Sequence, residues 1–411
     1  MIGLNDAFAR IAAENGRIGA LSDPIPPPDG APRQGPLTGM PIAIKDMIDT
    51  TPARCSSGLS FLTDYRPKRD AALVRRLRAA GAVIVGVSES DGGGFGARTP
   101  QVKNPVYADR IVGGSSGGSA AAVLAGFAEA AIGTDTGGSV RIPAACCGLY
   151  GLKPTYGRIP MEGVRPLAPS LDHAGIIARN LDSLMAVASV LDPALARGGA
   201  DRGRSVAVSI ELLEQANPPV RQATERAIEA FVKLGFTISL TLSLPRLTEI
   251  TRLHWSVFCA EAALAHREFS AAHLDSYPIY AQEPLKHGAI EAAGEYLDAK
   301  QRMSAIRRDL DRWLRRHDLL LLPTIPILTP LASAERVLVG GRDMSVTRAL
   351  ISNTCLFNHT GHPALAVPVP EEGSAEPPAS IQLIGRRNGD AALLGIARRL
   401  AEVLPPPRYP D

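Results

Sequence analysis

The chain has 411 residues, of which 44 are Lys or Arg and 41 are Asp or Glu, so its formal net charge at pH 7 is only +3. So small a surplus provides no concentrated positive charge for a nucleic acid or an acidic membrane surface. With 45% hydrophobic and 21% charged residues, the composition is that of a folded globular protein and excludes intrinsic disorder. We therefore expect no nucleic-acid partner and no membrane partner.

The first part of the chain alternates between helical and strand patterns. Apolar residues at helical spacing predict a helix over 4–14, and a Pro-rich loop follows over 23–36. Short apolar runs predict buried strands at 40–44 and 82–87, with an amphipathic helix between them at 71–80. This alternation favours an α/β fold with helices on both faces of a sheet.

The second part of the chain continues the same pattern around one helical segment. A strand, a helix and a strand are predicted at 205–209, 220–234 and 236–240, and 247–316 is mostly helical in pattern. No internal repeat and no long linker is found, so we expect a single domain over 1–411. Further predicted strands lie at 319–322, 364–369 and 381–384, before a last helix at 391–403.

The five cysteines argue against a disulfide framework. Their number is odd, their spacing is irregular, and Cys146 and Cys147 are adjacent. We interpret these two as small buried packing residues. The N-terminus has no basic start followed by an apolar block, which predicts a cytoplasmic protein without a signal peptide or membrane span.

Glycine is concentrated in one zone, with 15 glycines among the 66 residues from 86 to 151. There a strand-like run over 130–133 breaks into Thr136-Gly137-Gly138 and presents Ser139. Consecutive backbone N–H groups can converge beside a hydroxyl in such a turn, which is what the oxyanion of an acyl transfer requires. A lone Gly-Gly-Ser is more often a simple turn, but a second run, GGSSGGS at 113–119, lies upstream.

Two other interpretations of these runs are weaker. Glycine-rich turns also bind phosphate, yet the Gly-Lys-Ser/Thr ending of a P-loop and the Gly-x-Gly-x-x-Gly fingerprint are both missing. Residues 113–117 match the Gly-x-Ser-x-Gly pattern of a nucleophile elbow. Only Arg110-Ile111-Val112 precede this match, however, and they are too short for the strand that an elbow needs.

A serine nucleophile needs a base, and Lys45 is the candidate. It ends the apolar run 41–44, so burial would lower the pKa of its amine and leave it able to accept a proton. The alternative is a surface ion pair between Lys45 and Asp46 or Asp49. Spacing alone does not decide between these two.

Taken together, GPLTGMPIAIKDMIDT at 35–50 and the stretch from 113 to 160 resemble the amidase signature family of serine hydrolases. The resemblance covers most of the chain and is weakest over 206–316. It implies a single α/β/α domain with a mixed, mostly parallel central sheet. The signature core would span about 35–180, and the helical segment at about 247–316 would be an excursion within the domain.

The same resemblance implies a Ser-cisSer-Lys triad without metal or cofactor. Ser139 matches the nucleophile, Ser115 the bridging serine in a cis peptide, and Lys45 the base. Backbone N–H groups of Thr136, Gly137, Gly138 and Ser139 would form the oxyanion hole. Candidate substrate-pocket residues are Gly93, Gly94, Phe95, Gly114, Tyr150, Ile325 and Asn358.

We therefore expect an amidohydrolase that cleaves a small-molecule carboxamide, or a related C–N bond of the urea or hydrazide type. The resemblance leaves open whether the protein forms a homodimer. Two alternatives are a glutaminase-type subunit of a tRNA-dependent amidotransferase and a non-catalytic binding or scaffold protein on the same fold. The chain departs from the family pattern at Gly92-Gly93-Gly94, which predicts a roomier or more mobile mouth, or only a flexible loop. Its N-terminal helical extension is also short.

Overall fold

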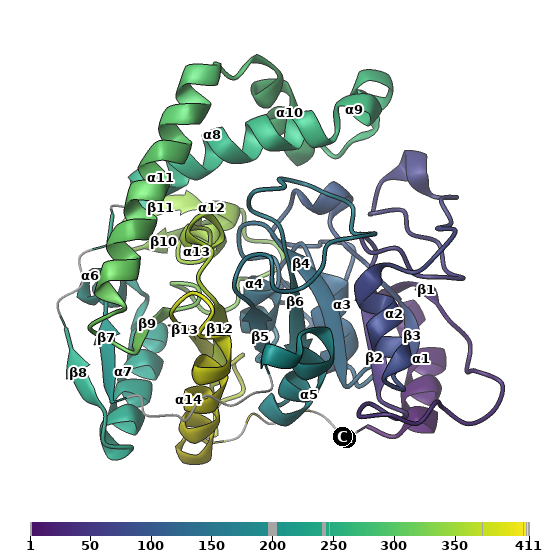
Figure 1. Ribbon diagram of the computed structural model, residues 1–411, viewed down its shortest axis with the longest axis horizontal. Coiled ribbons are helices and arrows are strands. Elements are labelled where there is room, and N and C mark those ends of the chain that lie inside the picture. Colours follow the sequence, from purple (N-terminus) through teal and green to yellow (C-terminus); the bar gives the residue numbers. More distant parts are fainter. Residues whose placement is uncertain are drawn as a thin grey trace.

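A computed structural model describes residues 2–195, 204–240, 244–245, 247–371, 373–405, 407 and 409. Within this part of the chain, an eleven-stranded sheet forms the centre of the molecule, with helices on both faces (Figure 1). The strand order across the sheet is β1-β3-β2-β4-β6-β5-β12-β13-β9-β7-β8. The strands are β1 (Leu21–Pro24), β2 (Pro41–Lys45), β3 (Val83–Ser88), β4 (Ala130–Asp135), β5 (Tyr150–Lys153), β6 (His173–Ala178), β7 (Ser205–Val208), β8 (Thr237–Ser239), β9 (Leu319–Pro323), β12 (Ala364–Val369) and β13 (Ala379–Ile384).

The sheet is mixed, as predicted, but the expectation that it is mostly parallel is wrong. Among the described strands, only β2–β3, β2–β4, β7–β8 and β7–β9 are parallel pairs. The other six neighbouring pairs are antiparallel. One change of direction occurs at β6, which runs antiparallel to β4 and pairs Asp135 with His173. Another occurs at β1, which runs antiparallel to β3. The prediction missed these changes because the apolar pattern of a strand does not encode its direction.

Alternation along the strands explains the two helical layers. Ile42 and Ile44 belong to one cluster of buried apolar side chains, whereas Ala43 between them belongs to another. Successive strand residues point to opposite faces, so each face presents its own apolar surface. Side chains of α2, α5, α7 and α14 pack in the first cluster, and those of α1, α3 and α4 pack in the second.

The helices lie close to their predicted positions where the apolar periodicity is clear. The main differences are short helices within the glycine-rich zone and near the C-terminus. Their bounds are α1 (Leu4–Ile18), α2 (Ala72–Ala79), α3 (Gly117–Leu124), α4 (Arg141–Cys146), α5 (Leu181–Leu191), α6 (Ile210–Gln215), α7 (Pro218–Lys233), α8 (Leu247–Ala265), α9 (Arg267–His273), α10 (Ile279–Ile290), α11 (Ala293–Trp313), α12 (Val346–Ile351), α13 (Leu356–Thr360) and α14 (Asp390–Val403).

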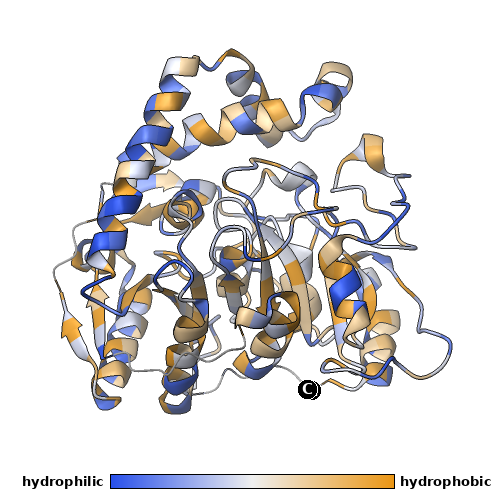
Figure 2. Ribbon diagram, in the orientation of Figure 1, coloured by the Kyte–Doolittle hydropathy of each residue, from blue (hydrophilic) through white to orange (hydrophobic). Residues whose placement is uncertain are grey.

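The segment predicted to be helical forms a layer over the ends of the central strands (Figure 1). Helices α8, α9 and α10 run across the top of the view, and α11 descends along one side (Figure 1). Much of α11 is hydrophilic (Figure 2), in agreement with a solvated face. A separate hairpin, β10 (Arg336–Val339) with β11 (Arg342–Ser345), lies before α12. No helix in the described ranges is long and apolar enough to cross a membrane.

Candidate active site

Lys45 is the last residue of β2, and its side chain is completely buried. Its Nζ donates hydrogen bonds to Ser115 Oγ at 2.7 Å and to Thr134 Oγ1 at 2.8 Å. Burial lowers the pKa of Lys45 to about 7, although carboxylates nearby, chiefly those of Asp91 and Asp135, act in the opposite direction. Near neutral pH a substantial fraction of this amine is therefore uncharged and able to accept a proton.

The alternative of a surface ion pair for Lys45 is wrong. The Asp46 carboxylate accepts instead from Ser56 Oγ at 2.7 Å and from the backbone N–H of Gly58 at 2.9 Å. Asp49 accepts from the phenol of Tyr65 at 3.3 Å. Neither carboxylate forms an ion pair with Lys45, because the end of β2 directs the lysine inward and the following turn directs both acids elsewhere.

Ser115 follows a cis peptide bond from Gly114, and its side chain is buried. The backbone N–H of Asp91 donates to the Ser115 carbonyl at 3.2 Å. Gly114 is confined by the same loop, since a Cβ there would lie 2.5 Å from the backbone nitrogen of Arg98. Gly114 is thus a packing residue beside Ser115. Asp91 holds this turn in place, and the sequence interpretation did not single it out.

Ser139 lies on a turn directly after β4, and it is brought to the Ser115 turn by the backbone. The N–H of Ser116 donates to the Ser139 carbonyl at 3.2 Å. Gly138 has φ 134°, and a Cβ there would lie 2.3 Å from Thr354 Oγ1. Only glycine fits this position.

The backbone amides of this turn are oriented from outside it. Thr354 Oγ1 donates to the Gly137 carbonyl at 2.6 Å. Because the carbonyl and N–H of a trans peptide point in opposite directions, this bond directs the Gly138 N–H away from Thr354. The N–H groups of Gly137, Gly138 and Ser139 donate to no other group among the described residues. They are therefore available to a bound oxyanion.

Thr136 and Asp135 fix the start of the turn. Thr136 Oγ1 donates to the Asp172 carboxylate at 2.6 Å. Asp135 and Arg141 are both fully buried, and the guanidinium donates to both carboxylate oxygens at 3.0 and 2.8 Å. Burial alone would raise the pKa of Asp135, but the Arg141 charge holds it well below its usual range. This buried pair ties the residues on either side of Ser139 together.

The glycine loop predicted at the mouth is closely packed. A Cβ at Gly93 would lie 2.9 Å from the Phe95 ring, and one at Gly94 would lie 2.8 Å from Met47 Sδ. Phe95 itself makes edge contacts with Phe258 and His266, which lie on and just after α8. The expected extra room is not present, because the helical layer covers the loop.

Two other predicted pocket residues lie away from the open side of the turn. Asn358 is buried, and its amide donates to the Asp135 carboxylate at 2.8 Å, so it supports the Asp135–Arg141 pair. Ile325 packs behind α4 in an apolar cluster with Ile142. These positions correct the expectation that both residues line the pocket.

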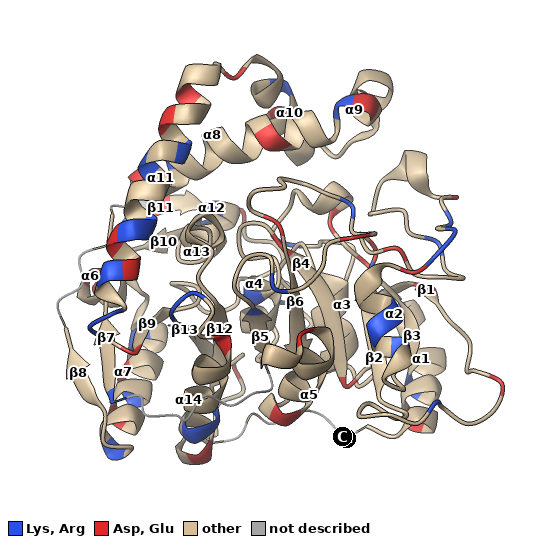
Figure 3. Ribbon diagram, in the orientation of Figure 1, with Lys and Arg blue, Asp and Glu red and all other residues tan. Residues whose placement is uncertain are grey.

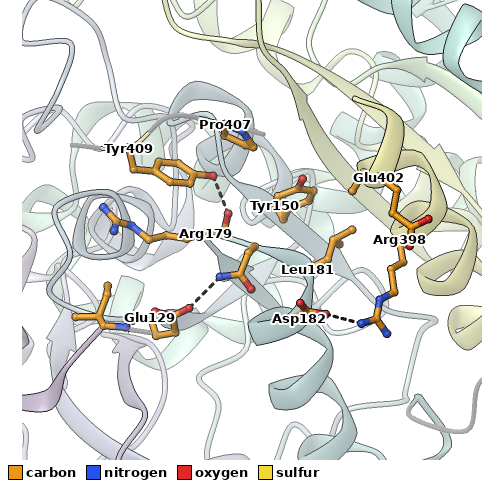
Figure 4. Close-up of a pocket in the computed structure, with 12 residues that line it drawn as sticks. Glu129, Tyr150, Arg179, Leu181, Asp182, Arg398, Glu402, Pro407 and Tyr409 are labelled. Carbon is orange, nitrogen blue, oxygen red and sulfur yellow. Dashed lines mark hydrogen bonds and ion pairs between the residues drawn. The ribbon is translucent and has the colours of Figure 1, made fainter. Parts of the chain in front are cut away.

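Tyr150 begins β5 and lies at the opposite end of the central strands from Ser139. It pairs with Ala178, as does the first residue of β4, whereas Ser139 follows the last. There it lines a different cavity with Arg179, Leu181 and Tyr409 (Figure 4). The prediction failed because α4 carries the chain back across the sheet between Ser139 and Tyr150.

A pair of histidines near the turn was also missed. His254 on α8 and His359 on α13 share a hydrogen bond of 3.0 Å between Nδ1 and Nε2. A Cβ at Gly137 would lie 3.1 Å from His254 Nε2, so the imidazole covers the candidate oxyanion turn. The two histidines are 105 residues apart, and no local pattern connects them.

The cysteine interpretation is confirmed. Cys146 and Cys147 are buried, and burial raises the pKa of the Cys146 thiol to about 12. Both are therefore unreactive packing residues. Among the described residues, no group of three or more His, Cys, Asp or Glu side chains is arranged to hold a metal ion.

Comparisons with known proteins assign the chain to a family. The family model described as amidase matches residues 28–394, so the chain belongs to the amidase signature family. A glutamyl-tRNA(Gln) amidotransferase subunit of Natronomonas pharaonis is 32% identical over 88% of this chain and 94% of its own length. AmiD of Mycobacterium tuberculosis, named as an amidase, is 31% identical over 90% of this chain and 81% of its own length. A solved amidase structure superposes with a TM-score of 0.88 and 29% identity, over 98% of this chain and 95% of that one.

Proposed function

We propose that this protein is an amidohydrolase that cleaves a small-molecule carboxamide through an acyl-enzyme on Ser139. The observation that carries the proposal is the buried Lys45 amine, which is hydrogen-bonded to Ser115 beside a turn with unused backbone N–H groups. A neutral amine, a bridging hydroxyl and free donors are what an activated serine requires.

The reaction would proceed in two halves. Lys45 takes a proton from Ser115, which takes one from Ser139 as its Oγ forms a bond to the amide carbon. The N–H groups of Gly137 to Ser139 stabilise the resulting oxyanion. The C–N bond then breaks, and the same proton returns through Ser115 to the leaving amine. In the second half, water passes a proton through Ser115 to Lys45 as its oxygen forms a bond to the acyl carbon. The bond between Ser139 Oγ and the acyl carbon then breaks, the proton returns through Ser115 to Ser139, and the carboxylic acid leaves.

Covalent labelling tests the nucleophile directly. Phenylmethylsulfonyl fluoride should add one sulfonyl group per chain, measured by intact mass. Ser139→Ala should abolish this adduct, and the exposed Ser60→Ala should retain it. An adduct that survives Ser139→Ala would overturn the assignment of the nucleophile. Absence of any adduct on the unaltered chain would favour a non-catalytic scaffold.

A glutaminase-type amidotransferase subunit is the second candidate. The Natronomonas protein, named as a subunit of a glutamyl-tRNA(Gln) amidotransferase, is covered over 94% of its length. The two functions differ in whether a partner is needed. The purified chain should hydrolyse members of a panel of aliphatic and aryl amides by itself. Turnover of glutamine that begins only when amidotransferase partner proteins are added would favour the alternative.

A further inference from the structure

A second cavity, of about 410 Å³, lies between α11 and the loops that flank α13. We name it the α11 cavity. From α11 it is lined by Lys300, Met303, Ser304 and Arg307, and from the other side by residues 155–156, 170–171, 358–361 and 387–388. None of the residues assigned to the triad lines it. It is thus distinct from the turn that carries Ser139.

The α11 cavity has a positive lining. Three of its lining residues are cations, Lys300, Arg307 and Arg387, and none of the described lining residues is Asp or Glu. Lys and Arg alternate with acids along α11 (Figure 3), so the helix as a whole is mixed in charge. The excess of cations is therefore a property of the cavity side of this helix.

The three cations differ in how far protein groups already satisfy them. Arg387 donates two hydrogen bonds of 2.9 Å to Asp311. Lys300 donates to Ser170 Oγ at 2.5 Å and lies 3.4 Å from a Glu261 oxygen. The half-buried Arg307 forms no hydrogen bond or ion pair with any described residue. Its planar guanidinium offers several unused donors, which match a carboxylate in two-point geometry.

The cavity is connected to the candidate active site through His359. This histidine lines the α11 cavity and is hydrogen-bonded to His254, which covers Gly137. Ser170, which accepts from Lys300, lies two residues before Asp172, the acceptor for Thr136. A ligand in the cavity would therefore lie against two of the elements that position the oxyanion turn.

We propose that the α11 cavity binds a small carboxylate anion through Arg307 and Lys300. The ligand is either the carboxylate end of the substrate or a free carboxylate that binds beside it. The first source rests on the proposed amidase function, whereas binding itself does not.

Calorimetric titration with glutarate tests binding directly. Glutarate should bind the full chain, and Arg307→Gln and Lys300→Gln should each weaken binding about tenfold or more. Arg312→Gln changes the charge by the same amount on the same helix, but its side chain is exposed, pairs with Asp309 and lies outside the lining, so it should leave the Kd unchanged. Absence of glutarate binding to the unaltered chain, or equal binding by Arg307→Gln and Arg312→Gln, would overturn the proposal. Binding by Ser139→Ala keeps this test independent of hydrolysis.

Kinetics with matched amides distinguishes the two sources. If the ligand is part of the substrate, Arg307→Gln should lower kcat/KM about tenfold for glutaramate and leave kcat/KM for valeramide unchanged. In that case glutarate should also inhibit glutaramate hydrolysis competitively. If the ligand is a free anion, Arg307→Gln should change kcat/KM equally for both amides, and glutarate should not compete with either amide. If neither amide is turned over, the amidase proposal is in question, and the calorimetric result alone decides the anion site.

Discussion

The imidazoles of His254 and His359 share a hydrogen bond of 3.0 Å between α8 and α13. Burial lowers the pKa of His254 to about 4 and that of His359 well below its ordinary value, so both rings are neutral at pH 7. One neutral ring donates and the other accepts, which fixes both orientations. Through this pair the helical layer is connected to the turn that carries Ser139.

Breaking the histidine pair should impair catalysis. In His359→Leu, His254 Nδ1 loses its partner and the ring over Gly137 loses its fixed orientation. We expect kcat/KM to fall about tenfold or more, since small displacements at a reacting centre are costly. The free energy of unfolding should fall by about 1–3 kcal/mol. The partly exposed His287→Leu on α10 is the control and should change kcat/KM little; equal losses in the two variants would contradict the role of the pair.

Activity should depend on pH through the Lys45 amine. Burial lowers the pKa of Lys45 to about 7, and only the neutral amine accepts a proton. Below pH 7 the protonated fraction grows, so kcat/KM should fall about tenfold per pH unit, and above pH 7 it should level off. A profile from pH 5.5 to 9 measures this. Lys45→Arg, which stays charged, should lose nearly all activity across the range.

The second buried lysine provides a control for this pH dependence. Burial also lowers the pKa of Lys153 to about 7, but its amine donates to the carbonyls of Pro154 and His362. Lys153→Met, checked for folding by circular dichroism, should still show the fall in kcat/KM below about pH 7. A kcat/KM that does not depend on pH in the unaltered chain would contradict the assignment to Lys45. So would a pH dependence that disappears in Lys153→Met.

The conformation of Gly138 should be essential for turnover. Its φ of 134° disfavours any side chain, and an added Cβ would lie 2.3 Å from Thr354 Oγ1. Gly138→Ala should therefore displace the oxyanion turn and reduce kcat about 100 to 1000-fold. Gly235→Ala is the matched control, because its φ is 81° but nothing lies within 4 Å of the added Cβ. It should cost about 1–2 kcal/mol of stability and leave kcat unchanged.

Removing the buried guanidinium should destabilise the whole fold. Arg141→Met leaves the Asp135 carboxylate buried without its counter-charge, so we expect a loss of about 3–5 kcal/mol in urea unfolding. The Arg17–Glu14 pair has a similar distance of 2.8 Å, but both side chains are well exposed. Arg17→Met should cost at most about 1 kcal/mol. Similar losses of unfolding free energy in the two variants would show that burial does not set the contribution of the Asp135–Arg141 pair to stability.

The buried strands and the longer helices could be predicted from local pattern. Apolar runs located β2, β3, β9 and β12, because a strand buried on both faces requires continuous apolar residues. The direction of neighbouring strands could not be predicted in this way. Hydrogen bonding between β4 and β6 depends on how a 37-residue connection returns to the sheet, and no residue in either strand encodes it locally.

The candidate site was predictable only in part, for a related reason. Lys45, Ser115 and Ser139 stand in short runs whose composition already indicates backbone donors and a hydroxyl. The pocket residues Tyr150 and Asn358 were expected from the family resemblance alone. The structure places Tyr150 at the far end of the central strands, and it buries Asn358 against the Asp135 carboxylate.

The sequence alone indicated the family and the residue types of the proposed triad, because glycine-rich turns and a lysine after an apolar run are local features. Only the tertiary structure decided that Lys45 is buried away from Asp46, and that His254 covers Gly137. The pKa of an amine and the accessibility of a backbone N–H depend on what surrounds them. Those surroundings come from segments distant in the chain, which meet only when the sheet and the helical layer are assembled.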